Sequence, residues 1–154
     1  MNDNIIYHGN VKLKIRTKQG KVLDIENHNT GTTKLFELIS RALCGRTIEQ
    51  GKPAYMAIAT GEVGSFVIAQ DRPSGIASAD YDSLTQNTVF LCTISAYQLR
   101  DINYDGASLL LLDNNTSEDN INNRVLAYIG LAMGANISTG TTLSVEWSMH
   151  FDNA

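Results

Sequence analysis

The end of the chain shows the clearest alternation of apolar and polar residues. From Leu143 to Asp152 every second residue is apolar, and each residue between them is polar or charged. A period of two over this length predicts a β-strand with one buried and one exposed face. Trp147 lies in the middle of the apolar row, so we expect its side chain to be buried. A strand this long needs neighbouring strands, which the earlier segments must supply.

The same alternation occurs twice near the start of the chain, on either side of a turn that contains Gly20. This pattern predicts a β-hairpin. A two-residue loop would mix buried and exposed faces, whereas a three-residue loop with a left-handed Gly20 keeps them apart. The register that this loop predicts pairs Leu13 with Ile25, Ile15 with Leu23, Lys12 with Glu26 and Lys14 with Asp24. The basic row of Lys12, Lys14 and Arg16 is then either a solvated face or a contact surface for an acidic partner.

Helical spacing of apolar residues follows the hairpin. The apolar positions are Leu35, Leu38, Ile39, Ala42 and Leu43. Thr32 and Thr33 are candidate N-caps, and Gly45 lies where a glycine commonly ends a helix. We therefore expect one amphipathic helix, from about Thr33 to Cys44, packed on the sheet.

The rest of the chain is typical of strands and turns. Predicted strands cover 53–60, 88–97, 109–112 and 124–131. Leu109 to Leu112 has no polar face, which favours a central strand covered on both sides. The stretch 61–86 is rich in Gly, Ser, Ala and Asp, and we interpret it as a long loop that is functional or ordered by a partner.

These elements predict a single β-rich domain over residues 1–154. A series of strands joined by turns favours a jelly-roll-like fold or β-sandwich, with one amphipathic helix inserted after the first hairpin. A mixed α+β sheet with the helix on one face is the alternative.

Composition narrows the classes of function that this chain can have. Apolar residues make up 43% of the chain and charged residues 18%, as in an ordered globular protein. The net charge of −4 does not suggest nucleic-acid binding. The first residues lack a basic head and an apolar run, so we expect no signal peptide, and no segment is long enough for a membrane span. Cys44 and Cys92 are expected to be buried free thiols.

One local motif suggests metal binding. Asp101, Asn103 and Asp105 alternate and are followed by Gly106, like the first half of a calcium loop. The position that should carry a bidentate glutamate is Leu112, so a polar turn is the preferred interpretation and calcium the alternative. The three histidines form no metal-binding pair, and no spacing indicates a catalytic group. We therefore predict no enzyme activity and no cofactor.

Taken in order, the elements resemble a small β-rich module of virion proteins from tailed bacteriophages. The matching segments are 27–30 after the hairpin, the helix ending at 43–45, the strand 53–61, then 124–128 and 143–151. The resemblance implies a structural part of the particle, at the tail, baseplate, connector or capsid surface. It transfers no catalytic residues. Such modules are expected to carry an acidic residue followed by Gly-Leu near the leucine strand, where this chain has Ala107, Ser108 and Leu109.

The resemblance makes a non-enzymatic virion protein the first functional expectation. It would assemble in the bacterial cytoplasm and dock in many copies on other virion proteins, or on copies of itself. The alternative is a module of the particle that binds carbohydrate on the host surface. The apolar triplet in the predicted long loop is the first candidate interface, with the basic row of the hairpin as the second. The candidate interface residues are Phe66, Val67, Ile68, Asp71, Arg72, Lys12, Lys14 and Arg16.

Overall fold

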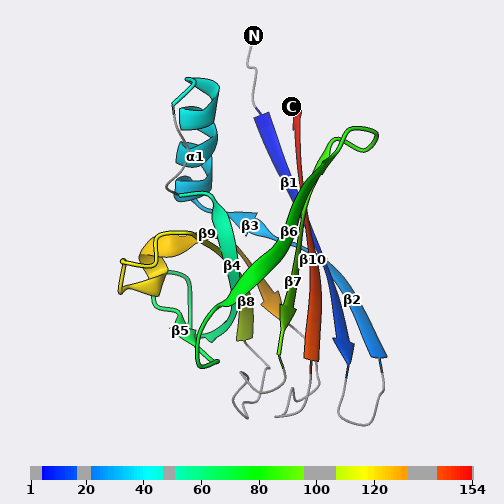
Figure 1. The fold of residues 1–154 in the computed structure, drawn as a ribbon, viewed down its shortest axis with the longest axis vertical. Coiled ribbons are helices and arrows are strands. Elements are labelled where there is room, and N and C mark those ends of the chain that lie inside the picture. The colour runs from blue at the N-terminus through cyan, green and yellow to red at the C-terminus, as the bar shows by residue number, and fades with distance from the viewer. Residues whose placement is uncertain (1–4, 17–21, 47–50, 96–106, 132–141, 154) are drawn as a thin grey trace.

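The structure is a computed structural model that describes residues 5–16, 22–46, 51–95, 107–131 and 142–153. These residues form ten strands, one α-helix and one 3₁₀ helix (Figure 1). The strands are β1 (Ile5–Arg16), β2 (Val22–His28), β3 (Thr30–Gly31), β4 (Pro53–Thr60), β5 (Val67–Ile68), β6 (Ser74–Asp82), β7 (Asn87–Ile94), β8 (Ala107–Asp113), β9 (Val125–Leu131) and β10 (Thr142–Asn153). The helices are α1 (Thr33–Leu43) and η1 (Ile121–Arg124).

The strands form a sheet that nearly closes on itself. Their order is β2-β1-β10-β7-β6-β4-β8-β9-β3, and β5 pairs with β4 beside this path. The two ends of the order approach each other because β3 follows β2 after one residue, Asn29, whose N–H donates to the Gly9 carbonyl at 3.0 Å. The result is a barrel-like β-sandwich with one helix after the first hairpin, which confirms the predicted fold class.

The last strand lies at the centre of one half of the sandwich. β10 pairs with β1 on one side and with β7 on the other, so Trp147 lies between Val11 and Phe90. All three side chains are buried, and Trp147 is fully so. The alternation along this strand therefore predicted its length and the burial of its apolar row as far as Met149, whereas Phe151 at the end of the row is 37% exposed.

The hairpin of β1 and β2 has the predicted register. Leu13 pairs with Ile25 and Lys12 with Glu26. On its other side Lys12 pairs with Glu146 of β10, so this lysine lies between two acidic positions. The side chain of Lys12 is exposed, while those of Lys14 and Arg16 lie outside the described part of the structure. An interface role for this basic row stays a prediction.

The four leucines of β8 serve two separate cores. Leu109 and Leu111 pack into the interior between the two halves of the sandwich, together with Trp147. Leu110 and Leu112 point to the opposite face, where Phe66 and other apolar residues cover them. Because successive side chains alternate across a strand, a strand covered on both faces must be apolar throughout.

The prediction of a long loop over 61–86 is wrong. This stretch contains β5 and the nine-residue β6, which pairs with β7 along most of its length. Most side chains of β6 are small or exposed, so the strand has little apolar signal of its own. It forms because β7 and the start of β4 supply its hydrogen-bonding partners.

The position of the helix was predicted correctly, but the burial of its last turn was not. α1 begins at Thr33 after the N-cap Thr32, and Leu35 and Leu38 of its first turns are buried. Leu43 is 76% exposed. Cys44 is exposed too, contrary to expectation, as are all residues from 42 to 46. Cys92, on β7, is buried as predicted.

Candidate functional site

A buried carboxylate, Asp113, is the centre of the most elaborate polar cluster in the described structure. It ends β8 and is 1% exposed. Its Oδ1 accepts hydrogen bonds from Arg124 Nε at 3.3 Å and from the Asn115 N–H at 3.0 Å. Its Oδ2 lies 3.3 Å from Lys34 Nζ. One carboxylate thus joins the end of β8, the first turn of α1 and the end of η1.

Arg124 is the main partner of this carboxylate and is itself buried, with 6% of the residue exposed. Its Nη2 donates to the Asp113 carbonyl at 2.8 Å, so the arginine contacts both the side chain and the backbone of Asp113. The guanidinium carbon lies 5.5 Å from the centroid of the Tyr55 ring, within the range of a cation–π contact. Buried charges need such partners because removing them from water is costly.

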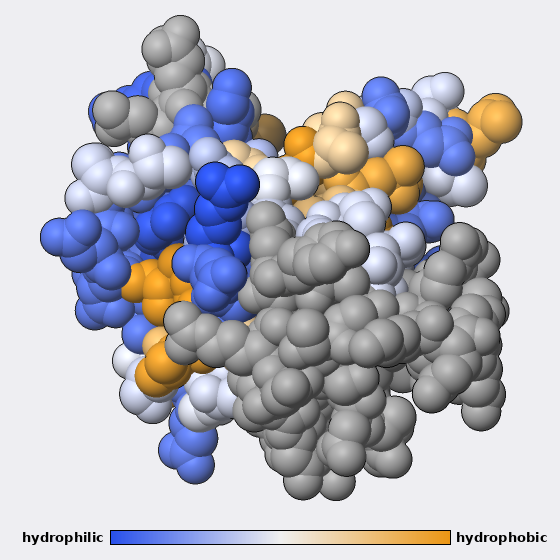
Figure 2. Space-filling model, turned by 60° about the horizontal axis from the view of Figure 1, so that its bottom comes forward, coloured by the Kyte–Doolittle hydropathy of each residue, from blue (hydrophilic) through white to orange (hydrophobic). Residues whose placement is uncertain are grey.

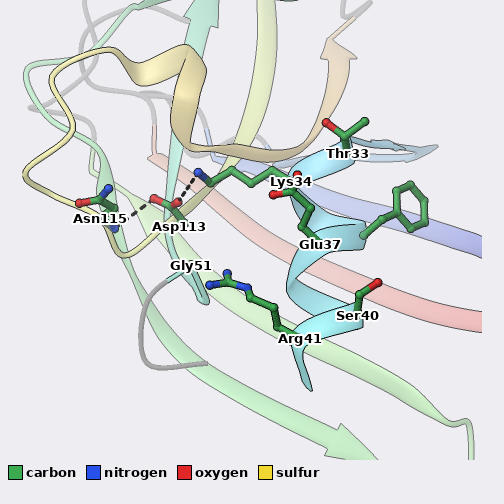
Figure 3. Close-up of a pocket in the computed structure, with 9 residues that line it drawn as sticks. Thr33, Lys34, Glu37, Ser40, Arg41, Gly51, Asp113 and Asn115 are labelled. Carbon is green, nitrogen blue, oxygen red and sulfur yellow. Dashed lines mark hydrogen bonds and ion pairs between the residues drawn. The ribbon is translucent and has the colours of Figure 1, made fainter. Parts of the chain in front are cut away.

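An open groove of about 650 Å³ lies between α1 and the segment that follows β8 (Figure 3). Lys34 points from α1 toward Asp113, and Arg41 points toward Gly51, which lies just before β4. Gly51 has a φ of 94°, a backbone conformation that strongly favours glycine. The residues that line this groove are Thr33, Lys34, Phe36, Glu37, Ser40, Arg41, Gly51, Asp113 and Asn115.

The chemistry of this groove is that of a polar contact surface. Cationic and acidic side chains both line it, and neither histidine nor cysteine does. Asp113 already contacts Lys34 and Arg124, so both of its carboxylate oxygens have partners within the domain. The arrangement therefore ties α1 to the end of β8.

Arg124 also lines a second groove, of about 540 Å³, formed where β4, β6 and β7 meet the loop before η1. Its lining residues are Tyr55, Arg72, Pro73, Ser74, Gly75, Thr93, Thr116 and Arg124. Arginine and hydroxyl groups dominate this wall, and no acidic residue is part of it.

The predicted apolar anchors lie in different environments. Phe66 is 5% exposed, and its ring centroid is 5.8 Å from that of Tyr128. The expectation that it is exposed in a flexible loop is wrong, because Phe66 covers the leucines of β8 as part of the second core. Asn122 fixes its backbone: the Phe66 N–H donates to Asn122 Oδ1 at 2.7 Å. Val67 is 63% exposed and Ile68 is half-buried, so an interface role for these two stays a prediction.

The remaining predicted site residues are scattered. Asp71 and Arg72 are exposed in the turn between β5 and β6, where Arg72 lines the second groove. The calcium candidates Asp101, Asn103 and Asp105 lie outside the described residues. Within the described ranges, no three His, Cys, Asp or Glu residues are grouped as metal ligands.

The buried thiol of Cys92 is a poor nucleophile. Burial raises its pKa to about 11, although a backbone hydrogen bond from Met56 opposes the shift. At neutral pH the group is therefore a thiol, while the reactive form of cysteine is the thiolate.

The turn between β6 and β7 is the most exposed apolar feature. It projects beyond the neighbouring strands (Figure 1) and carries Leu84, which is 94% exposed, and Tyr81, which is 66% exposed. The Leu84 N–H donates to Asp82 Oδ1 at 2.9 Å, and His150 Nδ1 lies 3.2 Å from the Gln86 carbonyl oxygen. On the face shown in Figure 2 the apolar surface forms separate small groups among polar residues rather than one broad patch.

Sequence reasoning missed the Asp113–Arg124 pair. The signal was present: Asp113 directly follows a strand of four leucines, and Arg124 is the first residue of the next predicted strand. In an antiparallel pair these two ends meet, which brings opposite charges together at the rim of an apolar core.

Comparison of the chain with protein-family models, with curated proteins and with solved structures gives no match. Among the described residues, no helix combines the length and the apolar character that crossing a membrane requires.

Proposed function

We propose that this protein is a non-enzymatic structural component that docks in many copies on other proteins of a bacteriophage particle. The observation that carries the docking role is the projecting turn between β6 and β7. The particle as its setting rests on the order of elements and on the segments that resemble virion modules of tailed phages.

The turn is built to present its apolar side chains. Asp82 holds the backbone of Leu84 by a hydrogen bond, and Gln86 adopts a left-handed φ of 57°, which is uncommon outside glycine. The backbone of Gln86 is in turn contacted by His150 of β10. A preorganised turn loses less conformational freedom on docking than a flexible one, which favours binding.

The sandwich behind the turn provides the rigid support that such a role needs. Its two cores bury apolar residues on both faces of β8, and neither core includes Leu84 or Tyr81. An apolar pair at the end of a projecting arm gains free energy when a neighbouring protein covers it. Many copies in one particle would add to the strength of each weak contact.

The test replaces Tyr81 and Leu84 together by serine and compares incorporation into particles made in cells that carry the gene. Leu43→Ser is the matched control, because Leu43 is also highly exposed but lies on α1. Both variants should keep the melting temperature of the native protein, since exposed side chains contribute little to stability. Only the double variant should lose incorporation, and unchanged incorporation would refute the role of this turn.

A further inference from the structure

We infer that the second groove, lined by Arg72 and Arg124, is a binding site for an oxyanion, the carboxylate or phosphate group of a small hydroxylated ligand. This inference is independent of docking through the β6–β7 turn, because the groove and the turn share no residue.

The first argument is the state of Arg124. Its Nε and Nη2 are bonded to Asp113, and Nη1 has no partner among the described residues. The ring of Tyr55 and the ion pair hold the guanidinium in one orientation at the wall of the groove. A fixed guanidinium binds a planar carboxylate or a phosphate better than a mobile cation does, because little freedom is lost on binding.

The second argument is the balance of charge around the groove. Arg124 and Arg72 both line it, and the carboxylate that pairs with Arg124, that of Asp113, is not part of the lining. Because no acidic residue lines the groove, the local field favours an anion even though the whole chain carries a net charge of −4.

The third argument is the position of Arg72. The turn that carries it is fixed by Gln70, a side chain that is 2% exposed. Gln70 Nε2 donates to the Arg72 carbonyl at 2.6 Å, while Gln70 Oε1 accepts the N–H of Ile58 in the sheet at 2.7 Å. The buried amide therefore ties the arginine turn to β4 and places Arg72 at the groove.

The size and lining of the groove indicate the kind of ligand. A volume of about 540 Å³ suits a small molecule. The hydroxyl groups of Tyr55, Thr93 and Thr116 can donate to and accept from the hydroxyls of a sugar. Gly75 leaves open space, since a Cβ added there meets no atom within 4 Å. An acidic monosaccharide and a sugar phosphate share the chemistry that this wall recognises.

The test is calorimetric titration of the whole protein at constant ionic strength with three probes: glucuronate, inorganic phosphate and glucose. Binding of glucuronate identifies a carboxylate as the ligand group, and binding of phosphate alone identifies a phosphate. Glucose should bind much more weakly than the anion. Amide chemical-shift changes during the titration should be largest around Gly75 and Thr116.

Arg72→Gln should weaken binding of the anion by about tenfold or more, the loss expected for a charged hydrogen bond. Its melting temperature should stay unchanged, because Arg72 is exposed. Arg46→Gln removes the same charge from an exposed residue that does not line the groove, and it should change binding less than about twofold. The inference is overturned if neither anion binds, or if both substitutions weaken binding equally.

Discussion

Removing the carboxylate of Asp113 is the perturbation whose effect the structure defines best. Asp113→Ala leaves Arg124 buried without its carboxylate partner, and loss of one member of a buried pair costs about 3–5 kcal/mol. Arg124 keeps its bond to the Asp113 carbonyl, which any residue supplies, so we expect the lower end of this range. Loss of the hydrogen bond from the Asn115 N–H adds about 1 kcal/mol.

Urea unfolding followed by the fluorescence of Trp147, the only tryptophan, measures this cost. Asp119→Ala is the control, because Asp119 is exposed in the same loop and should change stability by less than about 0.5 kcal/mol. Lys34→Met should cost less than about 1 kcal/mol, since the lysine side chain is 37% exposed and its ion pair is screened.

A double-mutant cycle tests the reasoning itself. Arg124→Met removes the other buried charge, and the double variant lacking both charges should cost less than the sum of the single variants by about 1 kcal/mol or more. Two results would contradict the importance of the buried ion pair. One is a loss of stability in Asp113→Ala no larger than that in the Asp119→Ala control. The other is a loss in the double variant equal to the sum of the losses in Asp113→Ala and Arg124→Met.

Four further outcomes follow from single side chains. Trp147 should emit at short wavelength in the native state and shift to the red on unfolding, and Trp147→Ala should cost roughly 3–5 kcal/mol; native emission like that of tryptophan in water would contradict its burial. A thiol reagent at pH 8 should modify Cys44 in the native protein and reach Cys92 only after denaturation. The pKa of Cys92 is raised in the folded protein, so the buried thiol contributes its full stabilisation below the pKa of the unfolded thiol. This contribution is lost as the pH rises toward about 11. The loss of stability with rising alkaline pH should therefore be less steep in Cys92→Ala. Hydrogen bonds from the backbone of Leu84 and then from Thr85 lower the pKa of Asp82. This carboxylate therefore stabilises the turn at neutral pH and stops doing so as the pH falls through the lowered pKa. Amide exchange at Leu84 should become faster in acid, and this change should be absent in Asp82→Asn.

Strands with a strong apolar pattern were predictable from the sequence. The alternation around Trp147 and the charge pairs of the first hairpin predicted pairing that the structure confirms. β6 was not predictable in this way, because its stability comes from the hydrogen bonds and packing of β7. Phe66 was misassigned for a related reason: it directly follows Gly64 and Ser65, which are typical of a loop, and the sequence does not show that it covers one face of β8.

The candidate sites depend on contacts between residues far apart in the sequence. Asp113 and Arg124 were visible as charges at strand ends, but nothing in the sequence brings Lys34 to the same carboxylate. Arg72 appeared only as the polar border of an apolar triplet, and the structure places it instead at a groove shared with Arg124. The turn that presents Leu84 was hidden within the predicted long loop.

Electron cryomicroscopy of particles purified from cells that carry this gene, combined with mass spectrometry of the same particles, tests the proposed function most directly. We expect the protein to be present in multiple copies. Density that fits its ten-stranded sandwich should occur at symmetry-related positions, with the turn between β6 and β7 in contact with a neighbouring protein. Particles that lack the protein, or density in which this turn faces solvent in every copy, would contradict the proposal.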